Sequence, residues 1–150
     1  MKRRVLLGTS GALLASLAVP SWATAAPTVQ VFKSPHCTCC AAWVAHMRKA
    51  GFEVSVAEVA EPAVMRERLG MPSRFGSCHT ATVGGYVLEG HVPADEVKRL
   101  LATKPAALGL AVPSMPPGSP GMEAGARHDP YHVLLIDRQG HESIYASYPK

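Results

Sequence analysis

The 150-residue chain lacks several features that would place it in a broad class at once. Its apolar N-terminal stretch, residues 5–19, is interrupted by hydroxyl side chains and falls short of the roughly 20 residues that a membrane-spanning helix needs. No cysteine lies near residue 25, which argues against a bacterial lipid anchor there. The chain also lacks a strong charge, because its formal net charge is only +4.

The N-terminus contains the three parts of an export signal. A short basic segment, Lys2-Arg3-Arg4, precedes the apolar stretch, and Ala23-Thr24-Ala25 has the small-x-small pattern of a cleavage site. We therefore expect residues 1–25 to be a signal peptide and residues 26–150 to be a periplasmic protein without stable membrane insertion. The arginine pair loosely matches a twin-arginine signal, so the Sec and the Tat routes both stay open.

Cleavage at that point would change the charge balance. It would remove 25 of the 150 residues and leave 125. The removed segment carries three positive charges, so the net charge would fall from +4 to +1. This balance removes the electrostatic reason to expect nucleic acid or an anionic membrane as a partner. A chain of this length is one domain with enough residues for a hydrophobic core.

Hydrophobic periodicity predicts an α/β fold for the core, residues 28–104. The expected elements are, in chain order, a strand at 28–33, a helix at 39–50, a strand at 52–59, a helix at 61–69, strands at 81–83 and 86–89, and a helix at 93–103. This is the order of a thioredoxin-like fold, a small mixed sheet flanked by helices.

Two further segments follow this core. Residues 105–130 are rich in proline and glycine and carry two methionines, a composition that predicts an ordered loop. Residues 131–148 contain two β-rich stretches around Asp137-Arg138-Gln139-Gly140, which predict an extra C-terminal β-hairpin.

The motif Cys37-Thr38-Cys39-Cys40 lies where the first strand meets the first helix. A helix N-terminus favours thiolates, which serve both as metal ligands and as nucleophiles. Three cysteines in four positions would close almost no loop, so the spacing disfavours a structural disulfide framework. Because Cys39 and Cys40 are adjacent, they do not easily point at one ion. The motif therefore favours several ions bridged by sulfur, and Cu(I) forms such clusters.

Cys78-His79 is the second chemical signal. It directly precedes the strand at 81–83, and in a thioredoxin-like fold that loop faces the N-terminus of the first helix. We expect Cys78 to be the fourth thiolate of the site. His79 is predicted either to bind metal or support a ligand, or to be a hydrogen-bonded loop histidine; the two interpretations have equal weight.

Weaker candidates lie elsewhere in the chain. Met115 and Met122 carry thioethers, which bind Cu(I), although packing of their loop onto the core is the slightly favoured interpretation. Trp43 and Met47 are expected in the core. His36, directly before the first cysteine, is expected either to bind metal or to raise the thiolate character of its neighbours. Solvent-exposed positions are the default expectation for five weaker candidates: His46, His91, His128, His132 and His141.

At SPHCTCCAAW, SCHTATVGGYVLEGHVPA and GLAVPSMPPGSPGME the sequence resembles the periplasmic copper-resistance proteins called CopG. The resemblance covers residues 29–123. It implies a thioredoxin-like fold and a cysteine-bridged, multinuclear copper site. The thiolates carried over to this sequence are Cys37, Cys39, Cys40 and Cys78. The implied partners are copper ions and other periplasmic copper-handling proteins.

Three functions remain as alternatives. The favoured one is a copper-binding protein of copper resistance that holds Cu(I) and cycles its redox state or only sequesters it. The second is a thiol–disulfide oxidoreductase that uses Cys37 and Cys40, against which Cys39 argues because a third thiol invites wrong disulfides. The third is a zinc-binding or structural module, against which the adjacent thiols and the methionines argue. Whether the protein is an enzyme, with copper or thiol redox activity, stays open.

Overall fold

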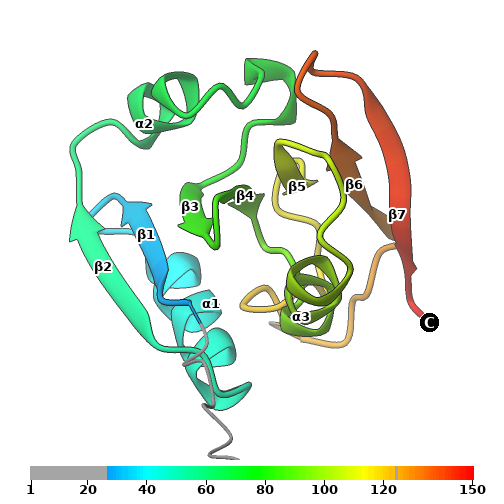
Figure 1. Ribbon diagram of the computed structural model, residues 1–150. Coiled ribbons are helices and arrows are strands. Elements are labelled where there is room, and N and C mark those ends of the chain that lie inside the picture. The colour runs from blue at the N-terminus through cyan, green and yellow to red at the C-terminus, as the bar shows by residue number, and fades with distance from the viewer. Residues whose placement is uncertain (1–26, 124) are drawn as a thin grey trace, which may run out of the picture.

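The computed structural model describes residues 27–123 and 125–150, so the predicted signal peptide, 1–25, lies outside the described residues. The elements are β1 (Val29–Lys33), α1 (Thr38–Lys49), β2 (Val54–Glu58), α2 (Pro62–Arg68), the 3-10 helix η1 (Ser73–Phe75), β3 (His79–Val83), β4 (Tyr86–Gly90), α3 (Ala94–Thr103), β5 (Gly109–Val112), β6 (Tyr131–Ile136) and β7 (Glu142–Tyr148) (Figure 1). The predicted α/β class and the order of elements through α3 are confirmed.

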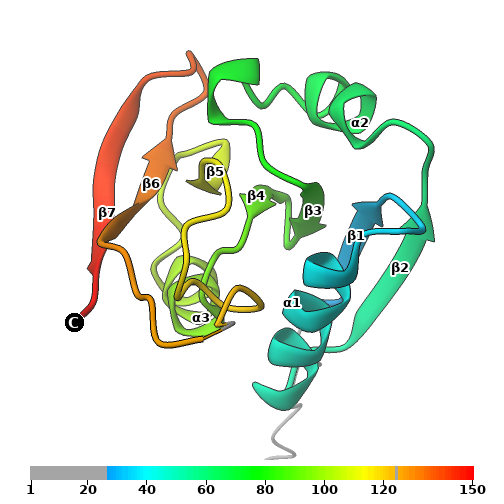
Figure 2. The same cartoon turned by 180° about the vertical axis from the view of Figure 1, so that it is seen from behind.

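Seven strands form one mixed sheet in the order β2-β1-β3-β4-β5-β6-β7. The pairs β1–β2 and β4–β5 are parallel and the other neighbours are antiparallel. Figures 1 and 2 show this sheet from its two sides, with β2 and β7 at opposite edges. The antiparallel pairing of β1 with β3 brings the loop before β3 to the end of β1, where α1 begins.

The hydrophobic core joins α1 to the centre of the sheet. Cys40, Trp43, Val44 and Met47 recur at helical spacing and are the buried residues of α1. The core positions predicted for Trp43 and Met47 are confirmed, since both are 0% exposed. The indole Nε1–H of Trp43 donates to the carbonyl oxygen of Val92 at 2.9 Å, which ties α1 to the segment that follows β4.

The prediction of a loop throughout residues 105–130 is wrong for β5. This strand is buried at all four residues and lies between β4 and β6. A run of four apolar residues has no periodicity that separates strand from loop, and its pairing partners decide its conformation. The predicted C-terminal hairpin, β6 and β7, is confirmed, but it continues the main sheet through β5.

A buried carboxylate fastens the C-terminus to α3. Glu96, 1% exposed, accepts hydrogen bonds from the hydroxyl of Tyr148 at 2.8 Å and from Lys150 Nζ at 2.7 Å. Its second oxygen lies 2.8 Å from Arg99 Nη2. The hairpin is therefore held by side chains that are separate from the cysteine-bearing end of the sheet.

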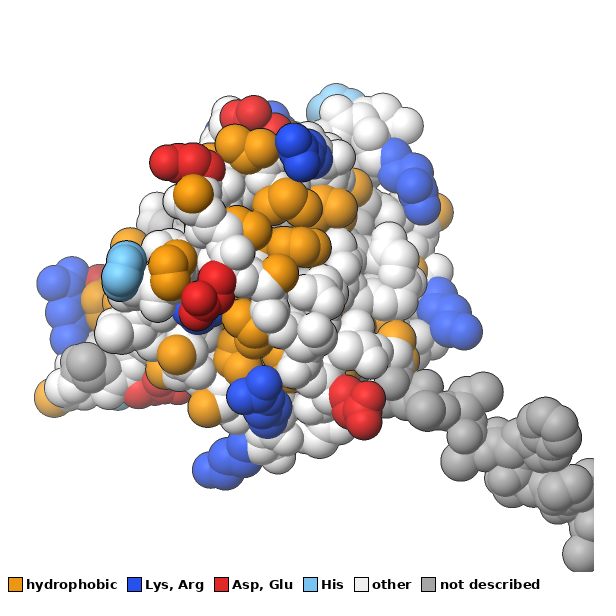
Figure 3. Space-filling view, turned by 90° about the vertical axis from the view of Figure 1, so that its left-hand side faces the viewer, with side chains coloured by type: hydrophobic (Ala, Val, Ile, Leu, Met, Phe, Trp, Pro, Cys, Tyr) orange, Lys and Arg blue, Asp and Glu red, His pale blue; other side chains and the backbone are white. Residues whose placement is uncertain are grey.

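The opposite edge of the sheet is formed by β2. Figure 3 shows this side of the molecule, where hydrophobic side chains gather among charged ones. Val56 of β2 is 38% exposed there.

Within the described residues, no helix has both the length and the apolar character that crossing a membrane requires.

Candidate metal centre

The three cysteines of the first motif lie at the N-terminus of α1. Cys37 is the N-cap residue, and its sulfur accepts a hydrogen bond from the backbone N–H of Cys40 at 3.3 Å. A Ser34-Pro35-His36 turn separates β1 from this cap, so the chain reverses directly into the helix. Cys40 points into the core and is 0% exposed, whereas Cys39 is half-buried.

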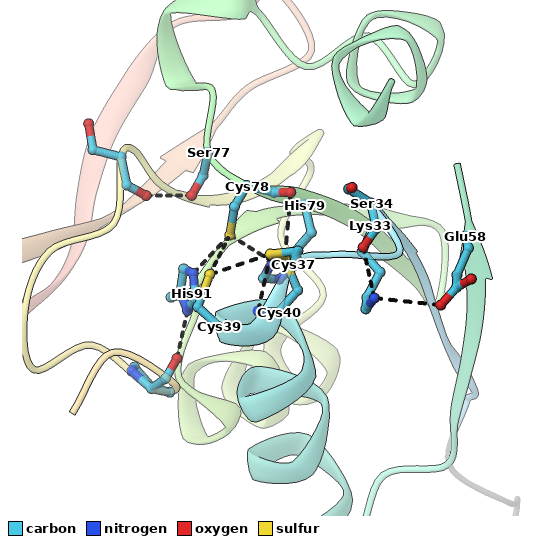
Figure 4. The surroundings of a disulfide bond; sticks show 12 residues. Lys33, Ser34, Cys37, Cys39, Cys40, Glu58, Ser77, Cys78, His79 and His91 are labelled. Atoms are coloured by element: carbon cyan, nitrogen blue, oxygen red, sulfur yellow. Dashed lines mark hydrogen bonds and ion pairs between the residues drawn. A yellow bond between two sulfur atoms is a disulfide. The ribbon is translucent and has the colours of Figure 1, made fainter. Parts of the chain in front are cut away.

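Cys78 joins these three residues from the loop before β3 (Figure 4). Its Sγ lies 3.8 Å from the Sγ of Cys39, which in turn lies 3.4 Å from the Sγ of Cys37. All four Sγ atoms lie within 4.8 Å of one another. The fold thus brings Cys78 to the first motif as predicted, and we call Cys37, Cys39, Cys40 and Cys78 the thiol cluster.

The thiol cluster is partly oxidised in this structure. Cys37 and Cys40 form a disulfide, while Cys39 and Cys78 are free thiols. The two bonded cysteines have the C-x-x-C spacing of dithiol oxidoreductases. In this state two of the four sulfurs are not available as thiolates.

The solvent exposure expected for His91 is wrong. His91 is 0% exposed, and its Nε2 lies 2.9 Å from the Sγ of Cys78. Its Nδ1 lies 2.7 Å from the carbonyl oxygen of Pro120, so Nδ1 carries the proton and Nε2 presents a lone pair to the sulfur. The register of the hairpin could have predicted this position. The end of β4 lies beside the start of β3, which brings His91 close to Cys78.

His79 completes a second group of donors with Cys78 and His91. Its Nδ1 lies 3.3 Å from the Sγ of Cys78. Its Nε2 is buried without a hydrogen-bond partner among the described residues. The ring packs against Trp43, with 4.5 Å between the ring centroids. The nitrogen of His79 that faces the other donors is therefore Nδ1, which makes Nδ1 the candidate metal-binding atom of this ring.

Burial sets the protonation of these donors. It lowers the pKa of His79 to about 3, with the neighbouring His91 contributing, and it lowers the pKa of His91. Both rings are therefore neutral at physiological pH, the form that binds metal. Burial and the nearby Cys39 raise the pKa of Cys78 to about 12. Cys78 thus stays a thiol in the free protein, and a bound cation would favour its deprotonation.

The methionine loop reaches the site through its backbone. Met115 is 46% exposed and Met122 is half-buried. Between them, Pro120 accepts the hydrogen bond of His91, and Gly121 lies against the first turn of α1. A Cβ on Gly121 would lie 2.8 Å from the backbone nitrogen of Trp43.

Neither group of candidate metal donors in the described part of the chain includes another histidine, and His36, directly before Cys37, is exposed. His46 is half-buried and accepts a hydrogen bond from the backbone N–H of Ala94 at 3.1 Å, contrary to the expected exposure. The expected exposure is confirmed for the remaining three: His128, His132 and His141.

If His91 binds a metal ion, Gly121→Ala is expected to weaken that binding. The added methyl group would push the loop away from α1 and withdraw the Pro120 carbonyl from His91. Losing such a partner of a metal-bound histidine typically costs roughly 10–100-fold in affinity. Gly125→Ala is the matched control, because Gly125 also has a positive φ, +82°, but its Cβ would meet nothing within 4 Å. Equal Cu(I) affinities of the two variants in a chelator competition would contradict this role of the loop.

Comparisons with known proteins agree with the chemistry of these donors. The family described as "Protein of unknown function, DUF411" matches residues 75–122. Two solved structures, described as Form 2 and Form 1 of a copper resistance protein CopG, are each 40% identical to this chain. Each match covers 83% of this chain and 99% of the other, with TM-scores of 0.79 and 0.78. No curated protein sequence matches the chain. Since the identity extends over nearly the whole length of those structures, the chain belongs to the CopG family of copper resistance proteins.

Proposed function

We propose that this protein binds copper as Cu(I) in the periplasm and contributes to copper resistance. The proposed ligands are the four sulfurs of the thiol cluster, and the site is proposed to hold several Cu(I) ions bridged by sulfur. The observation that carries the proposal is the convergence of all four Sγ atoms within 4.8 Å of one another. Soft thiolates select Cu(I), and adjacent cysteines suit bridging better than a single tetrahedral zinc.

His91 is proposed as a further ligand, with His79 beside it. Each ring has a nitrogen within 3.3 Å of the Cys78 sulfur, and both rings are neutral. The thioethers of Met115 and Met122 are weaker proposals. The 46% exposure of Met115 suits a ligand that passes copper to another copper-handling protein. The ammonium group of Lys33, 7% exposed, donates to the carbonyl oxygen of Ser34 at 2.8 Å and lies 3.9 Å from the carboxylate of Glu58, so it is engaged outside the thiol cluster (Figure 4).

Full copper loading of the proposed site requires reduction of the Cys37–Cys40 disulfide. A dithiol reductant supplies two electrons by exchange: its two thiols become a disulfide, and the two cysteines become thiols. Reduced protein is therefore expected to bind more than one Cu(I) per chain. Protein that keeps its disulfide is expected to bind fewer ions, because only Cys39, Cys78 and the imidazoles remain as donors.

The test is metal analysis of both forms under anaerobic conditions. Reduced and disulfide-bonded protein are titrated with Cu(I) against a chromogenic chelator, and zinc-loaded protein is then titrated with Cu(I). Copper should displace zinc, and the two forms should differ in copper stoichiometry. One tightly held zinc ion that copper does not displace would refute the proposed function.

Export is proposed from the N-terminal sequence. Cleavage after Ala25 predicts a mature chain of 125 residues beginning at Ala26. Intact-mass measurement of the protein recovered from the periplasmic fraction tests this. A soluble periplasmic species whose mass includes residues 1–25 would contradict the predicted cleavage.

The disulfide favours one second candidate function, a redox activity of Cys37 and Cys40. Oxidation of this pair to the disulfide releases two electrons and two protons. Those electrons suffice to reduce a disulfide substrate, or to reduce two Cu(II) ions to Cu(I). The same pair could thus serve copper redox cycling, and Cys39, 3.4 Å from the Cys37 sulfur, separates this candidate from an ordinary dithiol oxidoreductase.

A further inference from the structure

A buried carboxylate lies directly behind the Cys78 segment. Glu89 of β4 is 0% exposed. One carboxylate oxygen, Oε1, accepts a hydrogen bond from the backbone N–H of Ser77 at 2.7 Å and lies 3.3 Å from Arg66 Nη1. The other, Oε2, accepts from the hydroxyl of Thr80 at 2.6 Å. Both oxygens are therefore engaged, and two of the three donors belong to the chain around Cys78.

These contacts bracket two of the proposed metal donors. Ser77 precedes Cys78, and Thr80 follows His79, so Glu89 holds the dipeptide from both ends. Glu89 is also only two residues before His91, which directly follows β4. One side chain thus fixes the distance between the donors on the β3 side and the donor on the β4 side.

The residue between Glu89 and His91 supports the same close approach. Gly90 has a φ of +70°, and a Cβ there would lie 2.5 Å from Ser77 Oγ and 2.5 Å from the carbonyl oxygen of Val112. A glycine is therefore required for the Cys78 segment to lie against the end of β4. Glu89, Gly90 and His91 form a continuous stretch in which each residue contacts the Cys78 side.

A buried ion pair is a weak means of stabilising a fold, because desolvation opposes the attraction between the charges. Arg66 is itself nearly buried, with a side chain 12% exposed, and its Nε has no hydrogen-bond partner among the described residues. The pair is thus poorly suited to stability alone. It is well suited to holding a loop in one arrangement.

We propose that Glu89 is a positioning residue of the copper site, which holds Cys78 and His79 in register with His91. This inference rests on the proposed copper-binding function. It assigns Glu89 a role through the Ser77 N–H and the Thr80 hydroxyl, without contact between Glu89 and the metal. Partners of this kind around metal ligands typically contribute roughly 10–100-fold to metal affinity.

The experiment compares Glu89→Gln with Glu96→Gln. Glu96 is the matched control, because it is also a buried, ion-paired carboxylate, but its partners lie on α3 and at the C-terminus. Glu89→Gln is expected to lower the Cu(I) affinity by roughly 10–100-fold, and Glu96→Gln to leave it unchanged. Thr80→Val keeps the carboxylate and the side-chain volume but removes one donor. It serves as the second variant if Glu89→Gln fails to fold, and a smaller loss in the same direction is expected.

A second readout does not depend on copper. In protein with the Cys37–Cys40 disulfide, Cys39 and Cys78 are the two free thiols, so each can be alkylated and quantified by peptide mass. Glu89→Gln should accelerate alkylation of Cys78 several-fold relative to Cys39, and Glu96→Gln should not. Wild-type copper affinity together with an unchanged Cys78 rate in Glu89→Gln would overturn the inference. If the wild-type protein binds no Cu(I), the proposed function fails, and the Cys78 rate alone decides whether Glu89 positions this segment.

Discussion

Cys39→Ser is expected to remove most copper loading while leaving the Cys37–Cys40 pair intact. The Cys39 sulfur lies 3.4 Å from that of Cys37 and 3.8 Å from that of Cys78, between the disulfide-bonded pair and the loop thiol. A serine hydroxyl is a hard donor that stays protonated, so it does not replace a bridging thiolate for Cu(I). The copper stoichiometry of the reduced variant should fall below that of the wild type. Elemental analysis after anaerobic reconstitution measures this directly.

The same variant separates the two candidate functions. If the protein were a dithiol oxidoreductase, Cys39→Ser would retain insulin or glutathione disulfide reduction, and Cys37→Ser would abolish it. If copper binding is the function, both variants lose copper. Ala41→Ser is the control for adding a hydroxyl to this helix turn, because Ala41 is exposed. Full copper stoichiometry in Cys39→Ser would rule out the multinuclear thiolate site.

Cys78→Ser is expected to disrupt copper binding with little effect on the fold. Cys78 links the two donor groups, since it belongs both to the thiol cluster and to the group with His79 and His91. The remaining cysteines all come from one helix turn and leave one side of the site without sulfur. A serine hydroxyl can still donate a hydrogen bond to Nε2 of His91, so the free energy of unfolding should change by about 1 kcal/mol or less.

Two measurements keep the outcome of Cys78→Ser interpretable. Circular dichroism and thermal unfolding of the copper-free variant should resemble those of the wild type. A Cu(I) competition assay should show that Cys78→Ser has lost affinity. His132→Ala is the control for removing a donor from an exposed site, because the ring of His132 contacts Ser147 on the outer hairpin. Undiminished copper binding by Cys78→Ser would mean that the cysteines of α1 find their other ligands elsewhere.

Local sequence predicted the parts of the protein that local physics governs. Helical spacing of Trp43 and Met47 predicted α1 and its buried face, and the Cys37-Thr38-Cys39-Cys40 motif identified the chemistry at its start. The order of strands and helices followed from alternation and turn residues, with boundaries within about two residues. These features depend on neighbours within one or two turns of chain, so a single sequence contains them.

The convergence of Cys78 on this motif was predicted only through the resemblance in fold. Cys40 and Cys78 are 38 residues apart, and no local pattern brings them together. The antiparallel pairing of β1 with β3 does so. The structure confirms the mixed α/β architecture, and the thioredoxin-like fold stays a prediction.

Other features were decided by tertiary structure alone. The strand conformation of β5 comes from pairing with β4 and β6, because its four apolar residues carry no periodic signal. The sequence identifies Cys37 and Cys40, but it does not determine whether their thiols are oxidised to a disulfide. In the sequence, Glu89 is the last residue of the predicted strand 86–89 and His91 follows it, and neither has a local sign of burial. Both residues are buried because the β3–β4 register and the loop at Pro120 surround them and supply their hydrogen-bond partners. Segments that are distant in the chain cause this desolvation, so it leaves no local pattern in the sequence.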